Sequence, residues 1–168
     1  LQHLGNGIWL LNANLFIGPG VTLDLSPQSG VTELRLRSQA SAAVTYDYAS
    51  FVYLRTHSGE IDINGIKVYS WDPQANAVDQ EIKNGRAYII AKYAAVLNFT
   101  NAEVSYLGSA DGESYGVAWR DLNNSATPDQ LRTRVTGSVL NSRFHHNYYG
   151  VYTFQASGML FRGNKFYD

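Results

Sequence analysis

A six-residue pattern occurs four times in this chain without gaps, and it limits the possible folds more than any other property of the sequence. In each copy the first and last residues are apolar, the third is Gly or Asn, and the fifth is charged. Gly and Asn tolerate a left-handed backbone, which suits a sharp turn that leads into a strand. The charged residue then alternates outward from its apolar neighbour. The four copies are Ile63–Val68, Phe99–Val104, Val139–Phe144 and Phe161–Phe166.

The spacing between the copies indicates a solenoid. Their last residues, Val68, Val104, Phe144 and Phe166, are separated by 36, 40 and 22 residues, and the shortest interval suits a single rung. Solenoids allow loops to be inserted into individual rungs, which accounts for the longer intervals. We therefore predict an all-β, right-handed parallel β-helix with about 22 residues per rung, about five to seven rungs, and these four side chains stacked inward.

Polar stretches of suitable length lie in both longer intervals. The first contains 72–85, and the second contains segments near 109–114 and 123–134. The helix-length window Ala75–Lys83 has weak periodicity and lies between a proline and a glycine, so we predict a loop there. An antiparallel sandwich is the alternative fold, but inserted loops of about 14 to 18 residues are awkward in it.

Composition argues against several classes of function. The chain has 168 residues, a formal net charge of −1 and no cysteine. This charge gives no support for a nucleic-acid partner, and the lack of cysteine removes disulfides, thiol catalysis and cysteine metal sites. No apolar run reaches the length of a membrane span, and no signal peptide is visible. Because the chain begins with Leu1 rather than Met, we expect one β-helix domain over 1–168 that is a piece of a longer solenoid.

Several segments resemble the mannuronan C-5 epimerase family. They are Phe144–Met159, Arg162–Asp168, Phe99–Leu107 and Tyr53–Arg55. Members of that family are right-handed parallel β-helices of the pectin-lyase-like kind, and they invert C-5 of mannuronate residues within an alginate polymer. The resemblance implies a polyuronate-active protein that is secreted, attached to the cell surface or periplasmic.

One feature of the family is missing from this chain. A Tyr-Gly-Ile-Asp-Pro-His-Asp motif carries catalytic residues in the family and would be expected one rung after Tyr149-Gly150-Val151. No Asp-Pro-His-Asp occurs in the sequence, so we assign no catalytic residue and expect the motif to follow Asp168 in the parent protein. The chain would then be the N-terminal portion of an epimerase and would supply scaffold and substrate groove. A non-catalytic polysaccharide-binding or cell-surface scaffold and a polysaccharide lyase fragment are the alternatives.

Three basic residues suit the chemistry of a uronate polymer. Epimerisation needs a positive group at the carboxylate, a base on one face of the sugar and an acid on the other, and arginine binds carboxylates in a bidentate fashion. Arg55, Lys92 and Arg120 each end a strand-like stretch, and the repeat places them near one column. We predict that they form a stripe that binds an acidic polysaccharide such as alginate. The alternative is pairing with nearby acids, for example Arg120 with Asp121 or with a loop carboxylate.

Aromatic and histidine side chains complete the predicted groove. Tyr149 and Tyr152 could present rings to sugar faces, although inward packing suits such residues equally well. His145 and His146 face opposite sides if they lie in a strand, so one of them, His146, is taken as a candidate substrate contact. The histidine pair lacks further ligands, and Asp111-Gly112-Glu113 lacks the repeated pattern of calcium sites, so we predict neither an obligatory metal nor an organic cofactor.

Overall fold

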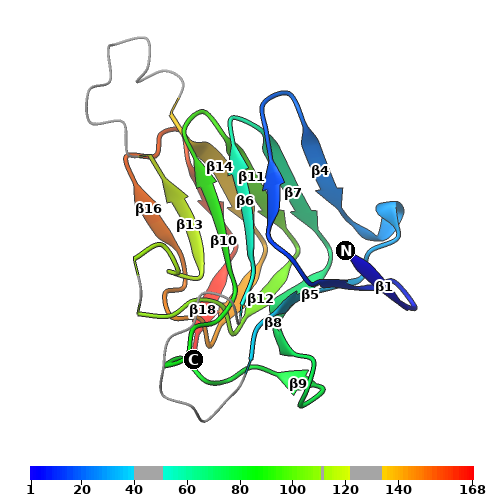
Figure 1. Cartoon of the computed structure of the whole chain (residues 1–168). Coiled ribbons are helices and arrows are strands. Elements are labelled where there is room, and N and C mark those ends of the chain that lie inside the picture. The colour runs from blue at the N-terminus through cyan, green and yellow to red at the C-terminus, as the bar shows by residue number, and fades with distance from the viewer. Residues whose placement is uncertain (40–50, 111, 122–133) are drawn as a thin grey trace.

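The computed structural model of the chain describes residues 1–39, 51–110, 112–121 and 134–168. Most regular structure in these ranges is β-strand, and the strands form three sheets that the chain visits in turn (Figure 1). A short 3-10 helix, η1 (Pro27–Ser29), is capped by Ser26, whose hydroxyl oxygen accepts a hydrogen bond from the backbone N–H of Ser29. No helix in the described ranges is long and apolar enough to cross a membrane.

Sheet A contains the strands that follow the repeated turn. Its order is β1-β2-β5-β8-β12-β15-β18, with β9 paired to β8. The pairs β1–β2 and β8–β9 are antiparallel, whereas the other pairs of this sheet are parallel. The strands are β1 (Gln2–Gly5), β2 (Ile8–Leu11), β5 (Glu33–Arg37), β8 (Lys67–Asp72), β9 (Ala77–Val78), β12 (Glu103–Ser105), β15 (Arg143–His145) and β18 (Lys165–Tyr167).

Sheets B and C are parallel throughout, and each has five strands. Sheet B contains β3 (Leu15–Ile17), β6 (Tyr53–His57), β10 (Tyr88–Lys92), β13 (Val117–Arg120) and β16 (Tyr152–Phe154). Sheet C contains β4 (Thr22–Leu25), β7 (Glu60–Asn64), β11 (Val96–Thr100), β14 (Thr136–Leu140) and β17 (Leu160–Arg162). Each rung runs from sheet B through sheet C to sheet A, so the described residues contain five rungs of a parallel β-helix, as the repeat predicts.

The predicted inward column is present in sheet A. Val104 pairs in register with Val68 on one side and with Phe144 on the other, and Phe144 pairs with Phe166. The first three side chains are at most 1% exposed, and burying each of them contributes about 1.5 to 3 kcal/mol. Phe166 continues the stack, with its ring centroid 5.4 Å from that of Phe144. It remains 47% exposed because β18 is the last strand of the sheet in this chain.

The corner between sheets C and A has the backbone that the repeat predicts. The third residue of every copy has a positive φ: 70° at Gly65, 51° at Asn101, 50° at Asn141 and 69° at Gly163. Backbone hydrogen bonds continue through this corner, for example from the N–H of Asn101 to the carbonyl of Leu140 at 2.9 Å. The turn therefore stacks from rung to rung together with the strands, and this explains why it repeats in the sequence.

The inserted segments leave the solenoid where the spacing places them. Within 72–85 the chain forms turns and the two-residue strand β9. The segment Ala75–Lys83 is therefore not a helix, as predicted, but the predicted loop contains this short strand, which pairs with β8. Arg86 anchors the end of this insertion, because its guanidinium is 1% exposed and donates to the carbonyls of Gly108 and His146, both at 3.0 Å. The insertion predicted at 123–134 lies, apart from Arg134, outside the described residues.

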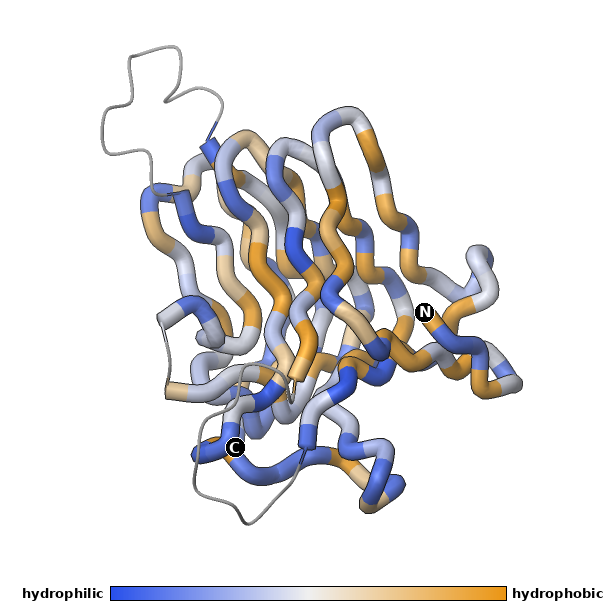
Figure 2. The backbone as a smooth tube through the Cα atoms, viewed as in Figure 1, coloured by the Kyte–Doolittle hydropathy of each residue, from blue (hydrophilic) through white to orange (hydrophobic). Residues whose placement is uncertain are grey.

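The core lies inside the coil, and Figure 2 shows the hydrophobic residues concentrated along the strands of successive rungs. Trp119 is its largest fully buried side chain and donates from Nε1 to the carbonyl oxygen of Leu97 at 3.0 Å. Gly137, which pairs with Leu97, provides the room for this indole. A Cβ at Gly137 would lie 2.0 Å from that carbonyl oxygen and 2.6 Å from the indole nitrogen.

Replacing Gly137 by Ala should therefore destabilise the chain. We expect the free energy of unfolding in urea to fall by about 1 to 3 kcal/mol, because the added methyl overpacks the contact between Trp119 and Leu97. Gly18→Ala is the matched control, since a Cβ there meets only the Phe16 ring at an ordinary 3.6 Å. Equal midpoints for the two variants would contradict the role given to Gly137.

Candidate functional site

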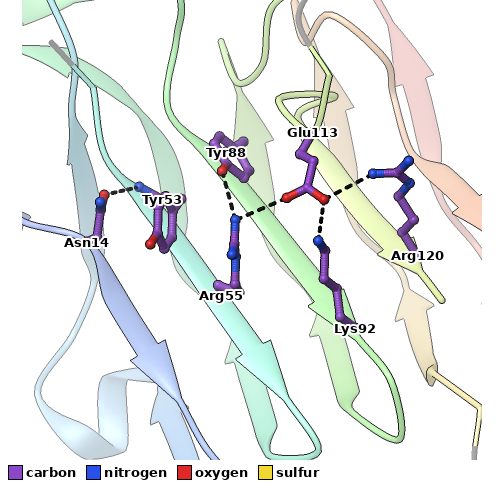
Figure 3. Close-up of polar contacts among 7 residues, drawn as sticks. All are labelled: Asn14, Tyr53, Arg55, Tyr88, Lys92, Glu113 and Arg120. Carbon is purple, nitrogen blue, oxygen red and sulfur yellow. Dashed lines mark hydrogen bonds and ion pairs between the residues drawn. The ribbon is translucent and has the colours of Figure 1, made fainter. Parts of the chain in front are cut away.

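Strand alternation places the three predicted basic residues on the outer face of sheet B (Figure 3). Arg55 comes from β6, Lys92 from β10 and Arg120 from β13. Ala91 pairs with Trp119, so the next residues, Lys92 and Arg120, lie at the same level. Arg55 pairs with Ile90, so it lies two residues earlier than Lys92 on the same face. The three residues therefore share one face, as predicted, but they form a triangle rather than a straight column.

A single carboxylate joins the three cations. Glu113 lies in the loop between β12 and β13, and its Oε2 accepts a hydrogen bond from Nη2 of Arg55 at 3.1 Å. Its Oε1 accepts from Nη1 of Arg120 at 3.1 Å and also from Nζ of Lys92. One loop carboxylate thus pairs with all three bases, which form the cation cluster, and this cluster retains an excess of positive charge.

The cluster alters the protonation of neighbouring groups. Burial raises the pKa of the Glu113 carboxyl, but the hydrogen bond from Lys92 and the three nearby positive charges outweigh burial and hold the pKa below its ordinary 4.5. Burial lowers the pKa of His57, the charges of Arg55 and Lys92 lower it further, and Glu113 opposes them. At neutral pH Glu113 is therefore an anion and His57 is a neutral imidazole.

Several buried nitrogen atoms in and beside the cation cluster have no hydrogen-bond partner among the described residues. The Nε atoms of Arg55 and Arg120 and Nε2 of His57 are buried and form no hydrogen bond with the described residues. The His57 ring instead packs edge-on against Phe16 and Tyr93, each at 4.9 Å between centroids. Neither arginine uses the two-pronged geometry that its guanidinium offers to a carboxylate, because each reaches Glu113 through one terminal nitrogen.

Tyrosine rings border the cation cluster on two sides. On one side Arg55 lies over Tyr53 at 4.4 Å, and its Nη2 donates to the Tyr88 hydroxyl at 3.3 Å. On the other side Arg120 lies 5.8 Å from the Tyr115 ring, which stacks on Tyr152 at 4.2 Å. We call these four rings, together with Tyr149 at 6.2 Å from Tyr152, the tyrosine border.

The structure brings most of the predicted site residues together. Tyr149 lies beside Tyr152, which stacks on Tyr115, and the Tyr115 ring lies near Arg120. His146 is not part of this group of side chains. His146 follows β15 with a φ of 54°, and its ring stacks on Tyr106 at 4.9 Å and contacts His145. Sequence reasoning missed Glu113 and the three tyrosines Tyr53, Tyr88 and Tyr115. Alternation could have found Tyr53, two residues before Arg55, but no periodic signal marks the loop residue Glu113.

The other candidate sites on the described surface have fewer of the features expected of a binding site. A groove along the corner of sheets C and A is lined by Lys67, Glu103, Arg143 and Lys165, in which both signs of charge occur and Arg143 pairs with Glu103 at 2.5 Å. This groove also has three cations and one acid, but only one of these cations, Arg143, forms an ion pair with Glu103, and no aromatic side chain lines the groove. No group of three or more His, Asp or Glu residues in the described ranges could hold a metal ion. The outer face of sheet B is therefore the candidate functional site.

Comparisons with known proteins identify relatives of this chain. No protein-family model matches it. The mannuronan C5-epimerase of Pseudomonas fluorescens is 24% identical over 170 aligned residues, which cover all of this chain and 30% of that protein. The mannuronan C5-epimerase AlgG of Azotobacter vinelandii is 24% identical over 164 residues, covering 96% of this chain and 29% of that protein. The crystal structure of the periplasmic alginate epimerase AlgG matches 96% of this chain and 36% of the solved chain, with a TM-score of 0.75 and 18% identity.

These comparisons confirm the resemblance and the fold class. The chain is homologous to mannuronan C5-epimerases and spans about 30% of the length of these curated relatives. Its three parallel sheets, stacked in register, form the same kind of β-helix as the solved alginate epimerase.

The lowered pKa of Glu113 makes its contribution to stability depend on pH. A carboxyl whose pKa is lower in the folded state stabilises that state above its unfolded pKa, here about 4.5, and this contribution is lost as pH falls through the folded pKa. We therefore expect the gap in unfolding free energy between the wild type and Glu113→Gln to shrink as the pH falls from the unfolded pKa through the lower pKa that Glu113 has in the folded state. Urea denaturation followed by tryptophan fluorescence measures it, and a gap independent of pH would show that the Glu113 charge adds no stability.

Proposed function

We propose that the outer face of sheet B binds an acidic polysaccharide of the alginate type, and that the chain forms part of the substrate groove of a mannuronan C-5 epimerase. The observation that carries this proposal is the convergence of Arg55, Lys92 and Arg120 on a single carboxylate, which leaves positive charge to spare. Homology to mannuronan C5-epimerases supports the choice of a uronate polymer as the ligand.

The chemistry of the face suits such a polymer. Arginine binds a carboxylate through paired N–H donors, and lysine adds a point charge, so the cation cluster offers both modes of recognition. Tyrosine rings provide flat apolar surface with a polar edge, which suits the faces and hydroxyls of a sugar ring. The tyrosine border would thus hold the sugar while the cation cluster neutralises its carboxylate.

The catalytic motif that the resemblance implies has no counterpart in this sequence. The Asp-Pro-His-Asp motif expected from the family does not occur, so the proposed role of the chain is scaffold and substrate binding. The second candidate is a polysaccharide-binding β-helix without catalytic activity, because the same cation cluster and tyrosine border would serve it. A lyase would begin with the same proton removal but would expel the linkage oxygen and leave an unsaturated, ultraviolet-absorbing sugar, so absorbance distinguishes it.

We also propose what covers the exposed end of the β-helix and where the protein is located. The exposed rings of Phe161 and Phe166, 41% and 47% accessible, would be covered by further rungs from the same protein or from another chain. The periplasmic origin of the solved relative supports a location outside the cytoplasm, in the periplasm, at the cell surface or secreted.

Changing Arg120 should weaken polyuronate binding in a graded way. We expect Arg120→Ala to weaken binding of oligomannuronate about tenfold, equivalent to about 1.4 kcal/mol, and Arg120→Lys to weaken it less, because lysine keeps the charge and loses only the paired donors. Binding should also weaken with salt, since exposed charges are screened over about 10 Å at 0.1 M. Isothermal titration calorimetry measures both effects.

Arg143→Ala is the matched control for this experiment. Arg143 is an arginine of sheet A that pairs with Glu103, and it has no contact with the cation cluster. Its loss should leave the affinity unchanged. Affinity at low salt that survives removal of all three charges of the cluster would show that these residues are only surface ion-pair partners.

The 168-residue chain should not epimerise mannuronan by itself. A positioned acid and base each contribute about 100- to 10,000-fold to a proton transfer, and the family motif that supplies them is absent. Incubation of polymannuronate with the chain in heavy water, followed by NMR, should show no exchange of the C-5 proton. Exchange above the rate without protein would refute this expectation and direct the search for a base to His57, the neutral imidazole beside the cation cluster.

A further inference from the structure

We infer that Glu113 is an internal competitor, whose side chain occupies the carboxylate position of the cation cluster and is displaced when a uronate carboxylate binds. This inference rests on the proposed function, because it names the regulation of the same face. Glu113 belongs to a loop rather than to a strand, so it reaches the outer face of sheet B from outside the repeating part of the fold.

The contacts of Glu113 are those of a replaceable ligand. It uses one nitrogen of each arginine, and the buried Nε atoms of Arg55 and Arg120 stay without a partner among the described residues. A free carboxylate is not tied to a loop and can turn to accept a pair of N–H donors from one guanidinium, which is the stronger arrangement. The cation cluster therefore offers an incoming uronate better geometry than Glu113 can use.

The surroundings of Glu113 permit the exchange. Its side chain is 29% exposed, so it can rotate towards water without crossing the core. The base of its loop is closed by a hydrogen bond from the N–H of Ser109 to the carbonyl oxygen of Ser114, which does not involve the carboxylate. Displacement thus costs the three ion pairs of Glu113, and these are re-formed with the uronate.

Removing the competitor should tighten binding. When only a fraction of the molecules has a free cation cluster, the observed affinity is reduced by that fraction. We expect Glu113→Gln, which keeps the shape of the side chain and removes its charge, to bind oligomannuronate at low salt about tenfold more tightly than the wild type. Glu113→Asp keeps the charge on a shorter side chain and should fall between the two, so it tests the inference even if the glutamine variant folds poorly.

Glu103→Gln is the matched control. Glu103 also pairs with an arginine, Arg143, but on sheet A, and its removal lowers the net negative charge of the chain by the same amount. A general effect of charge on the binding of a polyanion would therefore appear in both variants. An increase in affinity confined to the Glu113 variants would assign the effect to the cation cluster.

The protonation of His57 distinguishes exchange from simple addition of a second carboxylate. Glu113 raises the pKa of His57 against the effects of burial and of the charges on Arg55 and Lys92. If the uronate replaces Glu113, binding should leave this pKa nearly unchanged in the wild type and raise it in Glu113→Gln. If the uronate binds beside Glu113, the pKa should rise in both proteins, and the inference is wrong. NMR titration of the imidazole measures it.

The remaining outcomes separate the inference from the proposed function. If Glu113→Gln binds no more tightly than the wild type while Arg120→Ala still weakens binding, the face binds polyuronate and the competitor role is overturned. If neither the wild type nor either Glu113 variant binds oligomannuronate at low salt, the proposed function itself fails. Circular dichroism melts of each variant establish that the proteins compared are folded.

Discussion

Parallel pairing in register between successive rungs holds this chain together, and the position of each surface side chain follows from it. The column from Val68 through Val104 to Phe144 stays inside only because each strand pairs without slipping by one residue. A slip of one residue would turn every side chain of a strand to the opposite face. The same register that buries this column in sheet A brings Lys92 and Arg120 to the same level on the outer face of sheet B. Core and candidate site are therefore two consequences of one pairing pattern.

The repeating parts of this chain could be predicted from its sequence more fully than the parts that do not repeat. The left-handed turn residues Asn101 and Asn141 recur because the corner stacks, so spacing alone located them. The register of the repeat placed Arg55, Lys92 and Arg120 near one column, and the structure puts them on one face of sheet B. Glu113 lies in an insertion of irregular length, where no period relates its position to that of a strand. The sequence suggested a loop carboxylate as a partner for Arg120, but only the coordinates show one acid shared by three bases.

If the cation cluster binds a polyanion as proposed, stability and binding oppose each other on this face. Three positive charges held close together repel one another, by about 1 kcal/mol per pair at 4 Å even in water. Glu113 relieves that repulsion in the free protein, and its lowered pKa reports the favourable interaction. A carboxylate that stabilises the face without ligand also lowers the affinity of that face for a polyanion, because the polyanion must displace it. The two effects have the same origin, so a variant at Glu113 should lose stability and gain affinity together.

The position of the cation cluster along the solenoid indicates which part of a polymer it would hold. The resemblance to the epimerase family implies a catalytic motif one rung after Tyr149–Val151, and strands in a sheet are about 4.8 Å apart. Arg120 lies on β13, one strand before β16, so a strand carrying that motif would be two steps, or about 10 Å, away from it. A uronate bound at the cation cluster would then belong to the same polymer as the reacting sugar and lie close to it, without being the reacting sugar itself. Binding energy from such remote sugars can position the reacting one and offset the cost of distorting it. If the proposed function holds, the described face would align the polymer, and the proton transfer at C-5 would be left to residues of another rung.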